Sequence, residues 1–366
     1  MKVLHILDSL NRGGAEMLEL DVCRNAERNG LDLAFAATGG GSLEEDFQKS
    51  GVEFFRLNRR LPIDLVLVAK LRGIIKKNKF QIIHTHQPVA GIHAFLATRG
   101  TKIKLVLSFQ GFIPDKKNQL ITKFLVPRIA ANVACSEGLL EWLAEVEKTD
   151  VSRFRMIYNG VDRARLAYSG ESLKEELKIG ENVFLFGMVA HFYAHERKDQ
   201  ITLCKAFAKV AEKLPNAHLI IVGRIELGGE AKYDECVKIV KENNLQSRVH
   251  FLGQRDDLAK IVNSLDAYVF SSFYEGLPIA LMEAMLSKKP CILSDIAPHS
   301  EVSQNGEFAE VFETQNADDL AEKLLKIAEN DQFRKDLANR AYDFAKKTFS
   351  IEVHLRNLKN LYESII

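Results

Sequence analysis

Long apolar runs are missing from this sequence of 366 residues. No stretch of about 18 consecutive apolar residues occurs, so we expect no helix that spans a membrane. The opening segment, Met1–Leu7, is apolar only until Asp8 and Arg12. It is too short for the apolar core of a signal peptide and indicates a buried strand instead. These absences predict a cytoplasmic protein.

Paired cysteines are also missing. The five cysteines are odd in number and none belongs to a Cys-x-x-Cys pair: Cys23, Cys135, Cys204, Cys236 and Cys291. This pattern indicates a reducing compartment and argues against a disulfide framework or a structural zinc site. Gly-x-Ser-x-Gly elbows, Cys–His nucleophile arrangements and Walker phosphate loops do not occur either, which disfavours several common enzyme classes.

A strong excess of one charge is missing overall, since the net charge is +1, but the charges are unevenly spread. Residues 1–165 carry a net charge of +7 and the remainder −6. Residues 56–128 include 15 basic residues and only two acids, Asp64 and Asp115. Such a stretch is either a solvated face or a surface for phospholipid, a lipid diphosphate or nucleic acid. Nucleic acid is disfavoured because interleaved aromatic residues and known nucleic-acid motifs are missing.

What is present is a repeated alternation of short apolar runs and amphipathic stretches. In the first half the predicted strands are Val3–Leu7, Leu33–Ala37, Val52–Phe55, Ile82–His84, Leu105–Ser108 and Val133–Ala134, and the predicted helices include Ala15–Arg28, Ile63–Lys76 and Val89–Thr98. In the second half the predicted strands are Phe184–Val189, His218–Val222, Val249–Leu252, Ala267–Phe270 and Cys291–Leu293, with helices near Gln200–Lys213, Tyr233–Asn243, Leu258–Ser264 and Ile279–Ser287. The alternation predicts two doubly wound α/β domains with parallel sheets.

At about 100–200 residues per domain, the length also predicts two domains. We place them at 1–165 and 166–348. The chain is expected to be helical after Asn316, and its last part, about 349–366, has the pattern of an amphipathic helix that returns to the first domain.

The segment Ser271–Met285 carries the strongest chemical signal. An apolar strand ends at Phe270, and Pro278 suits the first position of a helix. Backbone N–H groups at such a helix start form an anion site. Glu275 precedes the helix and Glu283 lies on its second turn, so the two carboxylates could accept hydrogen bonds from the sugar and ribose hydroxyls of a bound diphosphate ligand. The alternative is that both are solvated charges favourable to the helix dipole.

The spacing Glu275-x7-Glu283 within FYEGLPIALMEAM resembles the signature of the retaining family 4 glycosyltransferases, which have the two-domain GT-B fold with a cleft between the domains. Further similar motifs run along nearly the whole chain: Gly13-Gly14-Ala15-Glu16, His84-Thr85-His86, Ala134-Cys135-Ser136-Glu137, Asn159-Gly160-Val161-Asp162, Arg197-Lys198-Asp199, Val222-Gly223 and Phe251-Leu252-Gly253. The combination is specific, whereas any one motif alone would be weak.

This resemblance implies a role for each matching position. Gly13 and Gly14 would let the backbone approach a phosphate or the acceptor. Lys198, helped by Arg197, would stabilise the leaving diphosphate together with the backbone of Gly276, Leu277, Pro278 and Ile279. Glu275 would hold the donor sugar and Glu283 the ribose, and the base would lie near Gly223, Gly253 and Leu258.

Two positions depart from the family pattern. His191 stands where the family usually has an arginine at the diphosphate, and Gln110 stands where it commonly has a histidine that reaches the donor sugar. Glutamine can still bind a hydroxyl, but histidine does not carry a fixed charge. We therefore expect both residues at the donor site, with Arg197 replacing part of the missing charge.

Three other groups resemble metal ligands only loosely. His84-x-His86 would place two imidazoles on one face of a strand end, with no third ligand expected nearby. His191 and His195 beside Glu196 lie on a predicted loop. Asp256-Asp257 opens a predicted helix, where acids favour the dipole. We expect no metal and no other cofactor.

The sequence thus predicts a retaining, metal-independent glycosyltransferase. It would move a hexose or N-acetylhexosamine from a nucleotide-diphosphate donor, UDP-linked in preference to GDP-linked, to a glycan acceptor. The basic N-terminal domain suits a lipid-linked acceptor at the cytoplasmic membrane face, as in surface polysaccharide or lipopolysaccharide assembly. Lys70–Lys79, a predicted helix end, and Phe112–Lys117, a predicted loop, would face that anionic surface. A small soluble acceptor, a nucleotide-sugar epimerase and a non-catalytic sugar-nucleotide sensor remain alternatives.

Overall fold

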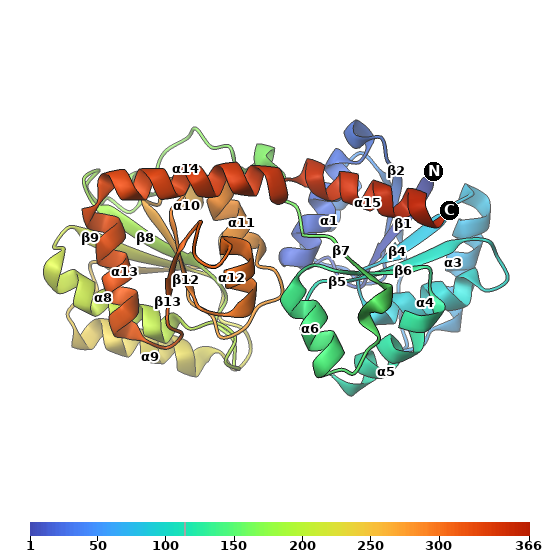
Figure 1. Ribbon diagram of the computed structural model, residues 1–366, viewed down its shortest axis with the longest axis horizontal. Helices are drawn as coiled ribbons and strands as arrows, with labels where there is room; N and C mark the ends of the chain where they lie inside the picture. Colours follow the sequence, from blue (N-terminus) through green and yellow to red (C-terminus); the bar gives the residue numbers. More distant parts are fainter. Residues whose placement is uncertain (113–114) are drawn as a thin grey trace. The chain divides into compact units, whose positions relative to one another are not determined.

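A computed structural model describes residues 1–112 and 115–366 of the chain. These residues form two compact units (Figure 1). Unit 1 comprises Met1–Asp162 and Phe349–Ile366, and unit 2 comprises Arg163–Thr348. The division lies three residues before the boundary that we place at 165/166, and the chain re-enters unit 1 at Phe349, where the terminal helix was expected.

Unit 1 is built on a parallel sheet whose strands, among the described residues, follow the order β3-β2-β1-β4-β5-β6-β7. The strands are β1 (Lys2–Leu7), β2 (Asp32–Ala37), β3 (Glu53–Arg56), β4 (Ile82–Thr85), β5 (Lys104–Phe109), β6 (Ala131–Ala134) and β7 (Phe154–Met156). Strands β1, β2, β4, β5 and β6 are almost wholly buried, as parallel strands covered on both faces must be. Apolar runs in the sequence predict all of these strands except β7, which is only three residues long.

Unit 1 has seven α-helices among its described residues, not all of which carry a side-chain cap. They are α1 (Gly14–Asn25), α2 (Glu44–Gln48), α3 (Leu65–Asn78), α4 (Pro88–Thr98), α5 (Lys116–Leu125), α6 (Glu137–Glu145) and α15 (Ile351–Ile365). Asp64, Asp115 and Ser136 accept hydrogen bonds from the first backbone N–H groups of α3, α5 and α6. Helix α15, red in Figure 1, packs on α1.

Unit 2 repeats the architecture with the strand order β10-β9-β8-β11-β12-β13 in its described, parallel sheet. The strands are β8 (Phe184–Val189), β9 (Ala217–Val222), β10 (Val249–Gly253), β11 (Ala267–Phe270), β12 (Cys291–Ser294) and β13 (Glu310–Phe312). The helices are α7 (Leu173–Glu176), α8 (Gln200–Lys213), α9 (Glu230–Glu242), α10 (Leu258–Ser264), α11 (Ile279–Leu286), α12 (Ala297–Ser303), α13 (Ala317–Glu329) and α14 (Asp331–Thr348). Of these strands, only β13 was not predicted from the sequence, and it too is three residues long.

Each sheet reverses its winding direction once. The reversal lies between β1 and β4 in unit 1, and between β8 and β11 in unit 2. Ligands of doubly wound sheets bind beyond the carboxyl ends of the strands at such points. The predicted site residues Gly13, His191 and Glu275 all follow strands that flank a reversal, which places the candidate sites there.

The fold also bears on the membrane question. No helix within the described residues is both long and apolar enough to cross a bilayer.

Candidate active site

Two loops of unit 2 are joined at the carboxyl ends of its central strands. Backbone Asp199 N donates to Ser271 O at 3.0 Å, and Phe273 N donates to Arg197 O at 3.0 Å. Lys198 and Ser272, between them, form an isolated antiparallel bridge. These contacts bring together Lys198 and Glu275, which are 77 residues apart in the sequence.

Lys198 and Glu275 form a buried ion pair, with the ammonium group directed at carboxylate oxygen Oε1. The Lys198 ammonium also lies over the ring of Phe270, 4.0 Å from its centre. Burial lowers the pKa of Lys198, and the Glu275 carboxylate opposes that effect. An ammonium group has three N–H donors. The pair therefore leaves Lys198 able to donate to a further anion while Glu275 holds it in place.

The backbone beneath this pair is fixed by Ser294, the last residue of β12. Its hydroxyl donates to Ser272 O at 2.8 Å and accepts from Ser272 N at 3.1 Å. Buried His299 lies 3.0 Å from the Ser294 carbonyl, and burial lowers the pKa of His299 to about 4. A neutral imidazole next to the pair adds no charge, so it supports the loop without competing for Glu275.

Helix α11 starts close to the expected position. The helix begins at Ile279, the first residue of the predicted range Ile279–Ser287, whereas Pro278, which suited the first helical position, has extended backbone angles (φ −74°, ψ 110°) and is the N-cap. It supplies no side-chain cap. The buried segment Gly276–Ile279 lies directly at the helix start. The first N–H groups of a helix have no partner within it, which suits this segment to an anion.

Glu283 lies on the second turn of α11, as predicted, but it has a partner that the sequence analysis missed. Arg165 Nη2 donates to Glu283 Oε1 at 2.6 Å, and both side chains are largely buried. Arg165 belongs to a short 3₁₀ helix, Arg163–Leu166, at the start of unit 2. No motif or periodic pattern marked it, because a single arginine in a polar connecting segment resembles any solvated charge.

His191 follows the end of β8, and a backbone N–H group from the neighbouring segment contacts its ring. Its Nδ1 accepts a hydrogen bond from Arg224 N at 3.1 Å. Burial, followed by the charge of Arg224, lowers the pKa of His191, so the ring is neutral at pH 7 and supplies no fixed charge. Arg197 is half-buried, with its guanidinium 5.0 Å from the centre of the Tyr193 ring. Arg197 thus carries a charge beside Lys198 that His191 lacks.

The residues predicted around the base lie on neighbouring strands of the same sheet. Gly223 has φ +157°, and a Cβ there would lie 2.2 Å from Ala190 O, so only glycine fits. Gly253 has φ +63° at a register shift between β10 and β9. Leu258 is the first residue of α10 and is half-buried. The structure therefore brings Gly223 and Gly253 to one edge of the sheet, with a hydrogen bond from Gly223 N to Gly253 O at 2.8 Å.

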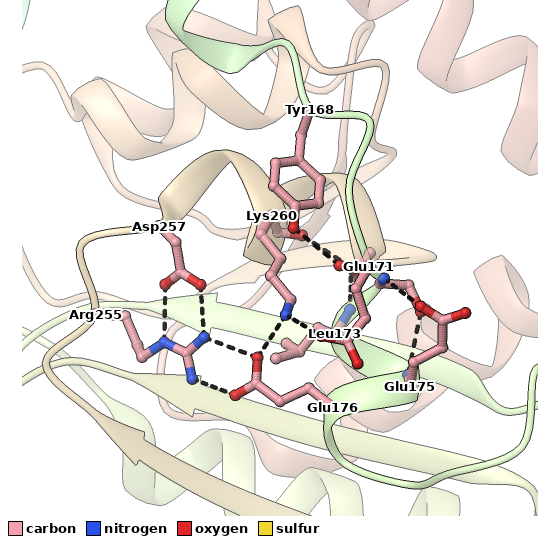
Figure 2. Close-up of polar contacts among 10 residues, drawn as sticks. Tyr168, Glu171, Leu173, Glu175, Glu176, Arg255, Asp257 and Lys260 are labelled. Carbon is pink, nitrogen blue, oxygen red and sulfur yellow. Dashed lines mark hydrogen bonds and ion pairs between the residues drawn. The ribbon is translucent and has the colours of Figure 1, made fainter.

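A network of charged side chains fixes the loop that leads into α10 (Figure 2). Arg255 donates to both oxygens of Asp257, at 2.8 and 2.6 Å, and to both oxygens of Glu176, at 2.6 and 3.0 Å. Lys260 adds an ion pair to Glu176 at 2.7 Å. Hydrogen bonds from Arg255 and Lys260 lower the pKa of Glu176 to about 2. Because Asp257 is engaged by Arg255, this network holds the loop and gives no support to the resemblance of Asp256-Asp257 to metal ligands.

The remaining predicted residues belong to unit 1. Gly13 is the N-cap of α1 and Gly14 its first residue. A Cβ added at Gly13 would lie 2.7 Å from the Glu16 carboxylate. Burial raises the pKa of Glu16 to about 7. Gln110 follows β5, and its buried Oε1 has no hydrogen-bond partner among the described residues.

Gln110 also lines a pocket of unit 1 with a volume of about 430 Å³. The pocket lies beyond the carboxyl ends of β1, β4 and β5. Its polar lining includes Asp8, Arg59, His86 and Lys117. It therefore combines hydrogen-bond acceptors suited to hydroxyl groups with cations suited to a phosphate.

The expectation that His84 and His86 lack a third neighbour is wrong. Strand β1 pairs with β4 in a register that places His5 opposite His84. The ligand atoms of His5, His84 and His86 all lie within 4.8 Å of one another, so the group could hold a metal ion. His5 was not expected in this group, because the sequence pattern of a strand does not show which strands are its neighbours.

Hydrogen bonds already engage most of this cluster. Tyr362 of α15 places its hydroxyl 2.8 Å from His5 Nε2 and 2.6 Å from His84 Nδ1. His5 Nδ1 lies 2.7 Å from the Glu19 carboxylate, and His84 Nε2 lies 2.7 Å from the Ser108 hydroxyl. The cluster therefore joins α15 and α1 to the sheet of unit 1.

Comparisons with known proteins agree with this fold. The family model described as Glycosyltransferase Family 4 matches residues 12–165, and that described as Glycosyl transferases group 1 matches residues 169–344. The chain is similar to an Escherichia coli protein, UDP-Gal:alpha-D-GlcNAc-diphosphoundecaprenol alpha-1,3-galactosyltransferase. The identity is 23% over 384 residues that cover 100% of this chain and 97% of the relative.

The name of a second relative mentions L-malate and no lipid carrier. It is N-acetyl-alpha-D-glucosaminyl L-malate synthase of Bacillus anthracis, 23% identical over 314 residues that cover 83% of this chain and 80% of the relative. Among solved structures, Anabaena Alr3699/HepE in complex with UDP and glucose shares the fold, with a TM-score of 0.84, 20% identity and full coverage of both chains. The likeness to the solved structure extends over the whole length of both chains.

The fold is thus GT-B, with two parallel-sheet α/β units. Because the two family models match residues 12–165 and 169–344, the chain belongs to the family 4 glycosyltransferases.

Proposed function

We propose that this glycosyltransferase moves a hexose or N-acetylhexosamine from a UDP-linked donor to a lipid-linked glycan acceptor, with retention of configuration and without a metal ion. The observation that carries the proposal is the buried pair of Lys198 and Glu275 beside the start of α11. It combines a cation for the departing diphosphate with a carboxylate for sugar hydroxyls.

Cleavage of the donor leaves negative charge on the β-phosphate, and stabilising that charge is the main task of the protein. In the proposed mechanism Lys198 donates to the phosphate with the N–H groups that Glu275 does not use. Arg197 and the N–H groups at the start of α11 supply the rest of the stabilisation. His191, whose pKa is lowered by burial, contributes a hydrogen bond and no charge.

The carboxylates then orient the donor. The Glu275 carboxylate accepts hydrogen bonds from the hydroxyls of the transferred sugar. Glu283 accepts from the ribose diol with the oxygen that Arg165 does not engage, so Arg165 fixes the direction of the carboxylate. Because Glu275 serves the hydroxyls, we assign no carboxylate nucleophile. The acceptor attacks from the face that the phosphate leaves, and the phosphate takes its proton.

The nature of the donor and acceptor is inferred from chemistry and from relatives. A solved relative binds UDP and glucose, and the E. coli relative uses a UDP-galactose donor and a diphosphoundecaprenol-linked acceptor. The pocket of unit 1, with Arg59 and Lys117 beside acceptor groups, suits a phosphate-linked sugar. The assignment to surface polysaccharide or lipopolysaccharide assembly at the cytoplasmic face of the membrane follows from such an acceptor.

A thermal-shift screen against UDP, GDP and their sugars tests the donor assignment. A ligand at 100 times its dissociation constant should stabilise the fold by about 2.7 kcal/mol. We expect the larger shift with UDP-linked donors. Incubation with the donor and a diphosphate-linked sugar acceptor should then yield a glycosylated acceptor and UDP. Stabilisation by GDP but not by UDP, or an epimerised nucleotide sugar as the product, would reject the proposal.

A further inference from the structure

Exposed apolar side chains cluster between β3 and the start of α3. Leu61, Ile63, Leu65 and Val66 are 61%, 53%, 71% and 66% exposed. They are four of the twelve large apolar side chains that the described residues expose. Single exposed apolar residues are common on protein surfaces, but four within six residues form a patch. We call these four residues the docking segment.

The backbone of the docking segment is anchored by a buried acid in its middle. Asp64 accepts hydrogen bonds from Val66 N and Leu67 N at 3.0 Å, and from Arg60 N at 2.9 Å. Its own N–H donates to buried His93 at 2.9 Å. The polar residue therefore faces inward while its apolar neighbours face outward, the reverse of the usual arrangement.

Cations flank the docking segment in the sequence. Arg59 and Arg60 precede it and Lys70 follows one turn into α3. None of these three forms an ion pair within the part of the chain that the structure describes. The two acids of the basic stretch, Asp64 and Asp115, are both helix caps whose carboxylates bind backbone N–H groups. The positive charge of this surface is thus not neutralised by its own acids.

Helix α5 presents a second surface of the same kind. Leu120 and Phe124 are exposed one turn apart, next to Lys116 and Lys123, and the Arg128 guanidinium lies 4.4 Å from the centre of the Phe124 ring. Lys116 and Lys117 belong to this helix, so the prediction of a loop is wrong for them, whereas Ile113 and Pro114 of that predicted loop lie outside the described residues.

The two surfaces lie at the same end of unit 1. Helix α4 contacts both α3 and α5, and the three helices follow one another across one face of the sheet (Figure 1). Each begins beyond the carboxyl end of the preceding strand, at the edge that carries the pocket. Two residues that line this pocket come from the two surfaces: Arg59 precedes the docking segment, and Lys117 belongs to α5.

We propose that unit 1 docks on an anionic phospholipid surface by inserting the docking segment among the lipids. Arg59, Arg60 and Lys70 would face the lipid phosphates and attract them electrostatically. Insertion of exposed leucine, isoleucine and valine side chains adds an apolar contribution that salt does not screen. A second copy of the chain is a poorer partner for this patch, since two equally basic surfaces repel each other.

The proposal goes beyond the proposed function, because vesicle binding needs neither donor nor acceptor. It can therefore fail while glycosyl transfer succeeds, and the reverse. If both hold, the docked pocket would open close to the headgroup layer, where a lipid-linked phosphate lies.

Flotation with vesicles tests the proposal. The full chain is mixed with phosphatidylcholine vesicles, or with an equimolar mixture of phosphatidylglycerol and phosphatidylcholine. The doubly substituted variants Leu65→Ser/Val66→Ser and Leu61→Ser/Ile63→Ser are compared with Leu227→Ser, a control at a 95% exposed leucine of unit 2. We expect the wild type and the control to float with the anionic vesicles, and each double variant to bind about 10-fold more weakly or worse.

Tryptophan fluorescence gives a second readout that does not depend on loss of binding. Leu65→Trp should show a blue-shifted emission on addition of the anionic vesicles, relative to the native Trp142 signal, whereas Leu227→Trp should not. Unchanged melting temperatures would show that the variants fold.

Three results would overturn the proposal. The first is equal recovery of the wild type with both kinds of vesicle, and the second is binding as strong as that of the wild type by the folded double variants. The third is a wild type that binds no vesicles and is a dimer, together with double variants that are monomers.

Discussion

Arg165 Nη2 lies 2.6 Å from Glu283 Oε1, so the carboxylate that we assign to the ribose is held by an arginine at the start of unit 2. A hydrogen bond to a charged group contributes about 1.5–3 kcal/mol, and its loss leaves the other group buried without a partner. We predict that Arg165→Ala weakens UDP binding about 10-fold or more, and reduces the preference for UDP over 2′-deoxy-UDP.

Titration calorimetry with the two nucleotides measures both effects. Arg163→Ala is the matched control, because Arg163 donates to Tyr342 at 2.6 Å and not to Glu283. Equal UDP affinity and equal ribose preference in Arg165→Ala and the wild type would show that Arg165 does not position Glu283.

The charge beside Lys198 leads to a second prediction. Arg197 adjoins Lys198 and replaces part of the charge that the neutral His191 lacks. Guanidinium groups suit phosphate oxygens, so Arg197→Ala should weaken UDP binding by about 10-fold. His191→Gln keeps a neutral hydrogen-bonding side chain and should change UDP affinity little. An Arg197→Ala protein with wild-type UDP affinity, beside a strongly impaired Lys198→Ala, would contradict this division of charge.

Metal removal gives a third prediction. We expect transfer to survive treatment with EDTA, because Lys198, Arg197 and the start of α11 supply the stabilisation of the leaving phosphate. The melting temperature should not change either, although His5, His84 and His86 lie close enough together to hold an ion. Activity lost to EDTA and regained with manganese or magnesium would refute metal independence, and a lowered melting temperature alone would point to the histidine cluster.

The histidine cluster of unit 1 makes stability depend on pH. Burial outweighs the attraction of Glu19 and lowers the pKa of His86 to about 4, and burial also lowers the pKa of His84 and His354. The unfolded chain then binds more protons below pH 6.5, so stability is present above that pH and is lost toward pH 4. His86 alone should cost about 2 kcal/mol between pH 7 and pH 5.

Urea unfolding at both pH values measures this loss. His86→Gln cannot gain the proton, so its free energy of unfolding should fall less between pH 7 and pH 5 than that of the wild type, whatever its stability at pH 7. Parallel losses in the two proteins would rule out His86 as a source of the pH dependence.

The sequence predicted the fold well where apolar periodicity was strong. Strand Phe184–Val189 and helix Gln200–Lys213 have the predicted bounds, because each consists of a clear apolar run or stripe. Strands β7 and β13 were missed because three residues give too short a pattern. Helix α5 was taken for a loop up to Lys117, although Asp115 is a residue type that caps helices.

The site was predictable where a local motif carries it, and not where it depends on packing. The spacing of Glu275 and Glu283 is visible in the sequence, and the family resemblance added Lys198. Arg165 and His5 were missed because their partners lie 118 and 79 residues away, and only the fold brings them together. A pattern within one element cannot show which elements are neighbours.

The central claim is that Glu275, paired with Lys198 at the start of α11, holds the donor sugar. Release of UDP from the accepted donor, in the presence of acceptor, tests it most directly in Glu275→Gln against the wild type, with exposed Glu307→Gln as control. We predict that Glu275→Gln loses transfer almost completely while the protein still folds, and that Glu307→Gln keeps full activity. Near-normal turnover by a folded Glu275→Gln protein would contradict the account.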